Sequence, residues 1–481
     1  MHNFNPTILR AYDIRGIYNE NLTEKDAFIL GKSFASYLHK IGKNKIAIGY
    51  DGRLSSPSLK ESLIKGLKES GLKIYDIGVG PSPMLYFAIY HLDVDAGIMI
   101  TGSHNPAEYN GFKIALRNKP FFGDDILQLD KINRAQDFID AEGSVENIDL
   151  IDDYVDRILQ NSLVKNSSKK LKIAWDAGNG AAGEVMRRIA LKINADNHLL
   201  YEKIDGNFPN HHPDPSVEKN LSDIKKLIAQ NNSDLGIAFD GDGDRIGVID
   251  DEGVMLYPDQ LLILYARDVL KNHPNANIIA DVKASQILFD EITKAGGNPV
   301  MHKTGHSFIK SKMQEIDAKL AGEMSGHIFF ADDYYGYDDA LYSAIRMIDI
   351  LLKDGRKLSD IRKSLPETFS TPEIKIESDD SKKFDIVKKL QSDLKAKNID
   401  FNDIDGVRAN DDNGWWLIRA SNTQPILVAR CEANSKDFQL ILADFLVCYE
   451  PNLIALKTQD LQLLLADFLV GYYPNLNTLN S

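Results

Sequence analysis

Three aspartates alternate with glycines in the segment FDGDGDR and could bind a divalent cation. Asp240, Asp242 and Asp244 follow an apolar run at residues 235–239 that is typical of a buried strand. Glycines allow backbone angles at which three neighbouring carboxylates can converge. Carboxylates without a nearby His or Cys are ligands that suit Mg²⁺. The segment therefore predicts a magnesium site, although a solvated Asp/Gly turn would have the same composition.

An EF-hand is the other cation site that this spacing partly matches. Its loop requires Gly at the sixth position and Glu at the twelfth. Those positions hold Arg245 and Asp251, and a strand rather than a helix precedes the loop. The EF-hand interpretation is therefore poor. An arginine next to three metal-binding carboxylates instead indicates a shared anionic ligand, such as a phosphoryl group.

A single serine, Ser103, lies between Gly and His in the segment TGSHNPAEYNGFKI at residues 101–114. A serine before Asn-Pro is most simply a turn residue. The G-x-S-x-G, H-E-x-x-H, Walker A and G-x-G-x-x-G motifs do not occur in their proper context. Ser103 therefore lacks the setting of a hydrolase nucleophile, and this segment alone leaves its role open.

Two further polar segments could bind a sugar phosphate, and each could equally be a structural turn. GEMSGHIFF places Glu323, Ser325 and His327 at alternate positions, where they offer donors and acceptors to sugar hydroxyls. IRASNTQP combines an arginine, two hydroxyls and loop N–H groups, which together could hold a phosphate. Other donors at strand ends or near the N-terminus, which are more often surface residues, are Tyr12, Arg15, Lys283 and His306.

Composition excludes several classes of function. The chain has 481 residues and a formal net charge of −14, so a nucleic-acid partner is not expected. Two cysteines, Cys431 and Cys448, are too few for a disulfide framework. Neither a signal peptide nor a membrane helix of roughly 20 apolar residues is recognisable. We therefore expect a cytoplasmic protein without a membrane partner.

Alternating strands and helices must position the polar segments. Apolar periodicity predicts a helix over residues 23–42, with Thr23 as its N-cap. Strand–helix pairs are expected within residues 45–71, 171–190 and 276–297, which indicates three related α/β units with mainly parallel sheets. After them, a helix and an antiparallel hairpin predict a C-terminal α+β domain.

Polar and proline-containing joints suggest the domain boundaries. Residues 143–160 are interpreted as a polar joint that leads into a bridging helix, and residues 365–376 as the end of the third unit. The expected domains are residues 1–152, 153–255, 256–368 and 369–450, followed by a tail at residues 451–481. A helix-like segment that begins at Asp437 recurs almost unchanged from Asp460, which indicates a segmental duplication.

Taken in order, the polar segments resemble the four signature loops of the α-D-phosphohexomutase family. TGSHNPAEYNGFKI, FDGDGDR, GEMSGH and RASNTQP carry the resemblance, and AYDIRG, DGNFPNHHPDP, DVKASQ and KTGHS also match. The likeness is to the bacterial phosphomannomutase/phosphoglucomutase branch and extends over about residues 8–447. It implies four domains around a central cleft, each of which supplies one loop.

The resemblance implies that Ser103 carries a phosphoryl group and that Asp240, Asp242 and Asp244 hold Mg²⁺ together with it. Ser103 would phosphorylate O6 of a hexose 1-phosphate, the hexose 1,6-bisphosphate would reorient, and its other phosphate would return to the serine. A phosphoserine adds about −1.5 to −2 charge, which Mg²⁺ and Arg245 would offset. Such transfer depends on in-line positioning and charge neutralisation.

The resemblance also assigns the remaining positions. His104 and Lys113 are candidates for proton handling or charge stabilisation, and Arg15 and Arg245 complete the catalytic group. The substrate-binding positions that it implies are Tyr12, Lys283, His306, Glu323, Ser325, His327, Arg419, Ser421, Asn422 and Thr423. Hexose phosphates are the implied substrates, hexose 1,6-bisphosphate the activator, and a monomer or weak homo-oligomer the expected state.

Alternatives and departures complete these expectations. A mutase specific for mannose phosphate alone or for glucosamine phosphate is the alternative within enzymes, and GEMSGH is less typical of the glucosamine branch. A sugar-phosphate binding protein without activity is disfavoured, because a sensor has no use for a phosphorylatable serine at a metal site. Cys431 replaces an apolar, often aromatic, residue of the family. Only one terminal helix is required, so the second copy of the duplicated segment is expected to be surplus.

Overall fold

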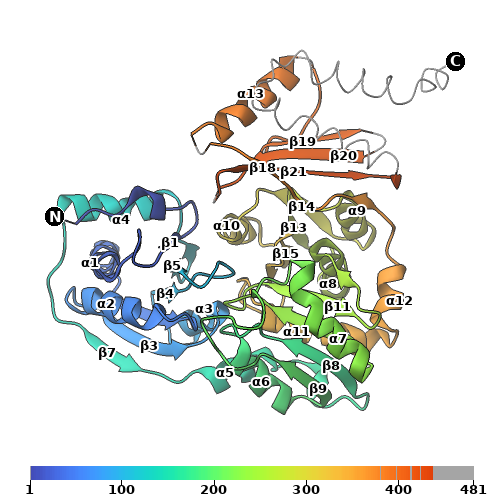
Figure 1. Ribbon diagram of the computed structural model, residues 1–481, viewed down its shortest axis with the longest axis horizontal. Coiled ribbons are helices and arrows are strands. Elements are labelled where there is room, and N and C mark those ends of the chain that lie inside the picture. Colours follow the sequence, from blue (N-terminus) through green and yellow to red (C-terminus); the bar gives the residue numbers. More distant parts are fainter. Residues whose placement is uncertain (1, 380, 397, 412–413, 423, 437–481) are drawn as a thin grey trace. The chain divides into compact units, whose positions relative to one another are not determined.

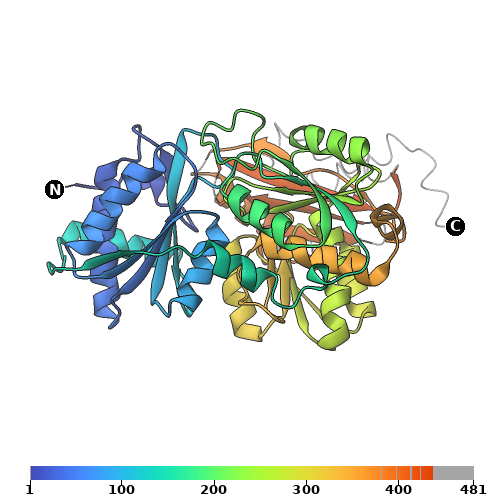
Figure 2. The ribbon, with the colours of Figure 1, turned by 90° about the horizontal axis from the view of Figure 1, so that it is seen from below.

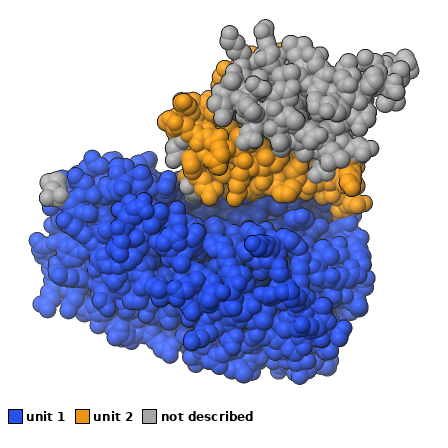
Figure 3. All heavy atoms as spheres, viewed as in Figure 1, with its two compact units in different colours: residues 1–301, 305–365 blue, residues 302–304, 366–481 orange. Residues whose placement is uncertain are grey.

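The chain forms two compact units, which are coloured separately in Figure 3. The computed structural model describes residues 2–379, 381–396, 398–411, 414–422 and 424–436. Unit 1 comprises Met1–Met301 and Gly305–Leu365, and unit 2 comprises His302–Thr304 and Pro366–Ser481. No helix within the described ranges is long and apolar enough to cross a membrane. The duplicated C-terminal segments from Asp437 onward, with Cys448, lie outside the described residues.

The first sheet of unit 1 has seven strands in the order β1-β5-β4-β2-β3-β7, with β6 paired to β5. Its strands are β1 (Ile14–Ile17), β2 (Lys45–Tyr50), β3 (Lys73–Val79), β4 (Ala96–Ile100), β5 (Tyr109–Leu116), β6 (Lys119–Pro120) and β7 (Ser144–Asn147). Its helices are η1 (Pro6–Ile8), α1 (Glu24–Lys40), α2 (Ser56–Lys68), α3 (Ser82–His91) and α4 (Asp124–Ala135). In β2, Ile46 and Ile48 belong to the apolar cluster of α1, α2 and α4, whereas Ala47 belongs to that of α3. Helices therefore cover both faces of this sheet (Figures 1 and 2).

Helix α1 has both features that predicted it from the sequence, an N-cap and a periodic apolar face. Thr23 caps the helix in a reciprocal capping box with Asp26. The periodic apolar side chains Ala27, Leu30 and Phe34 are all buried in the cluster beneath the helix. The expected N-cap and buried face of this helix are confirmed.

The segment at residues 143–160 differs from the expected polar joint. Ser144–Asn147 form strand β7, which pairs in parallel with β3, and helix α5 (Ile151–Ile158) follows. All four residues of β7 are exposed, so the strand has no buried face and shows no apolar alternation. Backbone pairing with β3 and an ion pair between Lys73 and Glu146 at 3.8 Å hold it at the sheet edge, and neither leaves an apolar pattern in the sequence.

The second and third sheets belong to unit 1 as well, in the orders β12-β11-β10-β8-β9 and β14-β13-β15-β16. The second segment contains η2 (Leu163–Lys165), β8 (Leu171–Asp176), α6 (Gly183–Lys192), β9 (Ala195–Leu200), η3 (Glu218–Leu221), α7 (Ser222–Asn231), β10 (Leu235–Phe239), β11 (Ile246–Asp250) and β12 (Met255–Leu256). The third contains α8 (Pro258–Asn272), β13 (Asn277–Asp281), α9 (Gln286–Lys294), β14 (Asn298–His302), α10 (His306–Ile316), β15 (Leu320–Gly322), β16 (Ile328–Phe330), α11 (Ala340–Asp354) and α12 (Leu358–Lys363). One apolar core extends from α3 and α5 through α8 and α11 and joins the three segments.

The three segments share one local arrangement, which confirms three related α/β units. Strands β4, β10 and β15 each pair in parallel with one neighbour and antiparallel with the next strand of the chain. The Ser103 loop joins β4 to β5, the FDGDGDR loop joins β10 to β11, and the GEMSGH loop joins β15 to β16. All three polar loops therefore occupy the same hairpin position in their own sheet.

Unit 2 contains the predicted α+β domain, in which every strand pairing is antiparallel. Its sheet has the order β17-β21-β20-β19, with β18 also paired to β21. Its elements are β17 (Phe369–Ser370), β18 (Ile374–Glu377), α13 (Lys383–Ala396), β19 (Val407–Asp411), β20 (Gly414–Ala420) and β21 (Ile426–Ala433). Cys431 is fully buried in its apolar cluster, consistent with its treatment as a small hydrophobic residue. The arrangement of four domains around a cleft stays a prediction.

Helix α11 is held at its start by the buried carboxylate of Asp339. Asp339 caps the helix by accepting from Tyr342 N at 2.9 Å, and it also accepts from the hydroxyls of Tyr154 at 2.8 Å and Tyr334 at 2.9 Å. The next residue, Ala340, donates its N–H to Gly243 O in the acidic loop at 3.3 Å. Burial raises the pKa of Asp339 to about 7, although these donors oppose the shift.

We expect Asp339→Asn to flatten the pH dependence of thermal stability. Because the pKa of Asp339 is higher in the folded than in the unfolded chain, the folded state holds the proton more tightly. The protonated Asp339 carboxyl therefore contributes to the free energy of unfolding. This contribution is complete below about pH 4 and is lost as the pH rises through about 7, and its size is up to roughly 4 kcal/mol. The measurement is the melting temperature between pH 5.5 and 8, with Asp354→Asn at the exposed end of α11 as the control. An unchanged slope in Asp339→Asn would contradict the assignment.

Candidate active site

The Ser103 loop places the serine hydroxyl against the acidic loop. Ser103 is buried, with 2% of its surface exposed, and its backbone has a positive φ of 50°. Its Oγ lies 3.2 Å from Asp240 Oδ2 and 3.2 Å from His104 Nδ1. The Asn105 N–H donates to Gly102 O at 3.0 Å, so the expected turn is present and presents the serine.

The acidic loop is in direct contact with the serine loop. A Cβ built on Gly241 would lie 2.4 Å from Ser103 O, so a larger residue would push the loops apart. Asp240, Asp242 and Asp244 are all fully buried, and they offer carboxylate oxygens within 4.8 Å of one another. Asp242 Oδ1 lacks a hydrogen-bond partner among the described residues. This oxygen-only set of buried carboxylates could hold a hard divalent cation.

Lys113 on β5 reaches the same carboxylates from the first sheet. Its Nζ lies 2.6 Å from Asp242 Oδ2 and 2.5 Å from Asp244 Oδ2. Burial favours the neutral amine, but the two carboxylates outweigh burial and hold the pKa of Lys113 well above its usual value. Burial and the neighbouring charges of Asp244 and Asp242 raise the pKa of Asp240. The cluster therefore carries more negative charge than one lysine offsets.

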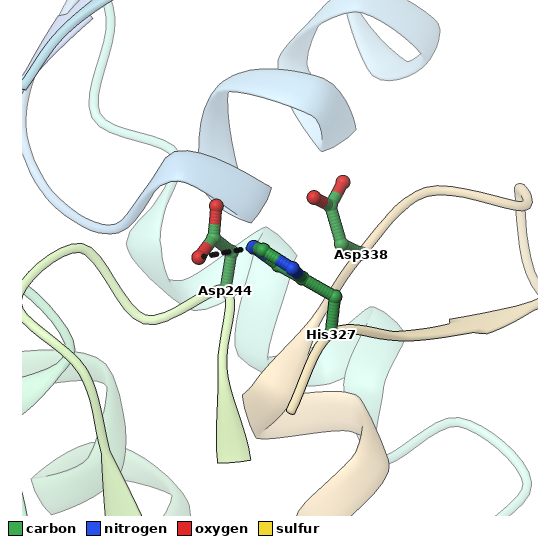
Figure 4. Close-up of side chains that lie close together, drawn as sticks. All are labelled: Asp244, His327 and Asp338. Carbon is green, nitrogen blue, oxygen red and sulfur yellow. Dashed lines mark ion pairs between the residues drawn. The ribbon is translucent and has the colours of Figure 1, made fainter. Parts of the chain in front are cut away.

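The GEMSGH loop is joined to the acidic loop through His327 (Figure 4). His327 Nε2 lies 3.3 Å from Asp244 Oδ1 and 3.4 Å from Arg245 Nε. On the other side of the ring, Nδ1 lies 2.8 Å from Ser325 Oγ and 3.0 Å from Glu323 Oε2. Burial lowers the pKa of His327, but Asp244 and Glu323 outweigh this and raise it to about 9. The imidazole is thus held between two carboxylates.

Asp338 and Lys310 were not identified from the sequence but lie beside this histidine. Asp338 is fully buried and offers a carboxylate oxygen within 4.8 Å of the ligand atoms of His327 and Asp244 (Figure 4). Its Oδ1 accepts from Lys310 Nζ at 3.0 Å, and its Oδ2 lies 3.6 Å from His306 Nδ1. Asp338 and Asp339 directly precede α11 and look in the sequence like ordinary N-cap residues. No local signal indicated that Asp338 belongs to the site.

Residues from the AYDIRG and KTGHS segments join the same region of unit 1. Arg15 donates to Asn105 Oδ1 at 3.2 Å and to Asp13 Oδ2 at 2.5 Å. The ring of Tyr12 lies edge-on to that of His306, with centroids 6.0 Å apart. Burial together with the charges of Arg245 and Arg15 holds the pKa of His104 well below its usual value.

Lys283 lies at the end of β13, close to the GEMSGH loop. Its Nζ is 3.7 Å from Asp281 Oδ2, and the same carboxylate oxygen accepts from Met324 N at 3.3 Å. Lys283 is 5% exposed. The strand-end position expected from the sequence is therefore adjacent to the candidate sugar-binding loop.

The RASNTQP segment forms the β20–β21 connection within unit 2. Arg419 donates through Nε to Asp405 Oδ2 at 2.9 Å, and Ser421 Oγ accepts from Gln424 N at 3.2 Å. Asn422 lies in this connection, whereas Thr423 lies outside the described residues. Arg419, Ser421 and Asn422 therefore share one hairpin, like the residues of the other three loops.

Ser82 is a further residue that the sequence did not single out. At the start of α3, its N–H donates to Asp242 O at 2.8 Å and its hydroxyl donates to Asp242 Oδ2. The Ser-Pro pair signals only a helix start. The contact with the acidic loop joins residues that are 160 positions apart and therefore leaves no local pattern.

Four family models match consecutive parts of the chain. They are described as phosphoglucomutase/phosphomannomutase, alpha/beta/alpha domains I, II and III, and the C-terminal domain. The matched residues are 6–138, 152–253, 257–369 and 373–444, respectively. Together the four matches cover most of the chain.

Curated and solved relatives agree with these matches. The chain is 43% identical to a phosphomannomutase/phosphoglucomutase of Pseudomonas aeruginosa, over 90% of this chain and 92% of that protein. It is 41% identical to a phosphoglucomutase of Neisseria gonorrhoeae, over 89% of this chain and 93% of that protein. A crystal structure of a phosphoglucomutase/phosphomannomutase family protein from Burkholderia thailandensis superposes with a TM-score of 0.86 at 39% identity, covering 92% of this chain and 96% of that one.

Proposed function

Because the chain belongs to the phosphoglucomutase/phosphomannomutase family, we propose that it interconverts hexose 1-phosphates and hexose 6-phosphates through a phosphoserine at Ser103. The observation that carries this proposal is the buried Ser103 hydroxyl, 3.2 Å from one carboxylate of the acidic triplet. A serine in this position can receive and return a phosphoryl group next to a metal ion. A hexose 1,6-bisphosphate is the intermediate, and in trace amounts it phosphorylates the enzyme.

Mg²⁺ is the cation that this donor set fits. Asp240, Asp242 and Asp244 would hold it together with the phosphorylated Ser103. When bound, it would offset the charge on the phosphoryl oxygens. Lys113 forms ion pairs with Asp242 and Asp244, which keep it charged. It therefore adds a fixed positive charge next to the proposed metal site.

The protein residues divide the remaining tasks according to their protonation states. In the first transfer, the bond between phosphorus and Ser103 Oγ breaks while phosphorus bonds to O6 of the hexose 1-phosphate. The proton of the O6 hydroxyl must leave, and the released Ser103 Oγ must gain one. His104, whose lowered pKa keeps it neutral and whose Nδ1 lies 3.2 Å from Ser103 Oγ, is the candidate that accepts the first proton and returns it to the serine. Against the opposing effect of burial, the carboxylates raise the pKa values of Arg245 and Lys113, and these two cations together with Arg15 would stabilise the transferring group.

Substrate recognition is assigned to the other three loops. Glu323, Ser325 and His327 offer both acceptors and donors to sugar hydroxyls, with Tyr12, Lys283 and His306 next to them. The residues proposed to bind the non-reacting phosphate are Arg419, Ser421, Asn422 and Thr423. We assign these tasks to four domains at residues 1–152, 153–255, 256–368 and 369–450.

The sugar is proposed to be glucose, mannose or both. The relative from Pseudomonas aeruginosa is named for both sugars, and that from Neisseria gonorrhoeae for glucose. We expect turnover of glucose 1-phosphate and mannose 1-phosphate in a coupled assay with Mg²⁺ and a trace of the matching 1,6-bisphosphate. Omission of the bisphosphate or chelation of Mg²⁺ should suppress the rate. Glucosamine 1-phosphate is the competing substrate, and activity on neither glucose nor mannose phosphate would overturn the proposal.

A further inference from the structure

We propose that Arg53 is the positioning residue of the Ser103 loop, an inference that rests on the proposed phosphoserine function. Arg53 lies between β2 and α2, outside every segment assigned above, and its side chain is fully buried. It is too enclosed to contact substrate. We infer that it acts on phosphoryl transfer only by fixing the backbone that carries Ser103.

The two terminal NH groups of the Arg53 guanidinium donate to carbonyls of this loop. Its NH2 group donates to Ser103 O and Asn105 O, both at 2.7 Å. Its NH1 group donates to Pro106 O at 2.5 Å and to Tyr109 O at 3.0 Å, and Nε donates to Asp51 Oδ2 at 3.0 Å. Four donors of one planar fork thus meet four carbonyls between Ser103 and Tyr109, and the fifth meets the Asp51 carboxylate, a pattern that lysine cannot reproduce.

Asp51, the partner of Arg53 Nε, is also hydrogen-bonded to the residues that fix the backbone N–H of Ser103. Its Oδ2 accepts from Thr101 Oγ1 at 2.8 Å and from Gly102 N at 3.2 Å. Thr101 Oγ1 in turn accepts from Ser103 N at 2.8 Å. The carbonyl of Ser103 is therefore fixed by Arg53, and its N–H is fixed through Thr101 by Asp51.

The conformation of Ser103 explains why such a support is required. A serine with φ of 50° lies in the left-handed region, which costs an L-residue other than glycine about 1–2 kcal/mol. Without the guanidinium, four turn carbonyls would lose their common donor, and the loop could relax toward ordinary φ values. A displacement of about 1 Å of a reacting group can cost roughly 10²-fold in rate.

The second α/β segment closes the other side of the guanidinium. The ring of Phe208 lies 5.2 Å from Arg53 Cζ in a cation–π contact. A Cβ on Gly102 would lie 2.5 Å from Arg53 Cζ, so the turn rests directly on the guanidinium. Arg53 is thus enclosed between the serine loop and the DGNFPNHHPDP segment, with no room for water or substrate.

The test compares Arg53→Lys with wild type in the coupled assay. The lysine keeps the charge but loses the fork, so we expect kcat to fall roughly 10–10²-fold with KM for the hexose phosphate nearly unchanged. Arg134→Lys, at an exposed position of helix α4, is the matched control and should leave both constants unchanged. An unchanged kcat, or a rise in KM that accounts for the loss, would overturn the inference. An inactive wild type would instead overturn the proposed function.

Chemical rescue separates positioning from general stability. In Arg53→Ala, added guanidinium should restore part of kcat, whereas the same concentration of ammonium should not, because only the planar cation spans the four carbonyls. Phe208→Leu, which keeps an apolar cover, serves if Arg53→Ala does not fold, and its kcat should fall with KM unchanged. A folded Arg53→Ala without rescue, or a Phe208→Leu with wild-type kcat where Arg53→Ala does not fold, would contradict the assignment.

Discussion

Ser103→Ala is expected to lower turnover of glucose 1-phosphate and mannose 1-phosphate by roughly 10³-fold or more. The substitution removes the oxygen that we propose forms the phosphoryl bond, and no described residue offers another hydroxyl at the same position beside Asp240. The fold should survive, because among the described residues the hydroxyl hydrogen-bonds to Asp240 and His104 and not to the core. The backbone of the turn is held independently by Arg53 and Asp51.

Two measurements check this expectation together. The coupled assay reports turnover, and intact-mass analysis should show a phosphate adduct on the wild-type protein that Ser103→Ala lacks. Ser58→Ala, at the first turn of α2, is the control and should retain both the adduct and the rate. If Ser103→Ala kept the adduct and the activity, a different residue would carry the phosphoryl group.

The sequence predicted those parts of the site that are formed by residues close together in the chain. Asp240, Asp242 and Asp244 are neighbours in the chain, and their spacing with glycines was sufficient to predict a convergent carboxylate cluster. The capped helix α1 and the strand before the acidic loop follow from periodicity over a few residues in the same way. The position of Ser103 in a turn was also evident from Asn105-Pro106.

Contacts between distant segments could not be predicted in this way. Lys113 meets Asp242 and Asp244 across 129 and 131 residues, and no spacing rule links them. Arg53 and Ser82 occur in Asp-Gly-Arg and Ser-Pro sequences that are common in turns and at helix starts. Their significance depends on which loop the tertiary fold places against them, and that information is distributed over the whole core of unit 1.

Asp242→Asn is expected to abolish the response to Mg²⁺ without unfolding the protein. The amide has the shape of the carboxylate but lacks its charge, so the donor set loses one of its three anionic ligands. Asp242 Oδ2 accepts from Lys113 Nζ at 2.6 Å and from the Ser82 hydroxyl, whereas Oδ1 is buried without a hydrogen-bond partner among the described residues. We expect activity to fall about 10²-fold or more, because the transferring group would lose its main counter-charge.

Thermal melting with and without Mg²⁺ distinguishes a metal role from a structural one. A cation at about 100 times its Kd stabilises the folded state by about 2.7 kcal/mol, so the wild type should melt at a higher temperature with Mg²⁺. The quantity compared is the Mg²⁺-induced shift within each variant, because Asp242→Asn also removes a charged partner of Lys113 and one of the charges that raise the pKa of Asp240. Asp251→Asn, beyond β11, should keep the full Mg²⁺ response. A full response in Asp242→Asn would show that the cation binds elsewhere, because a site built from these three carboxylates cannot lose one charge without weaker binding.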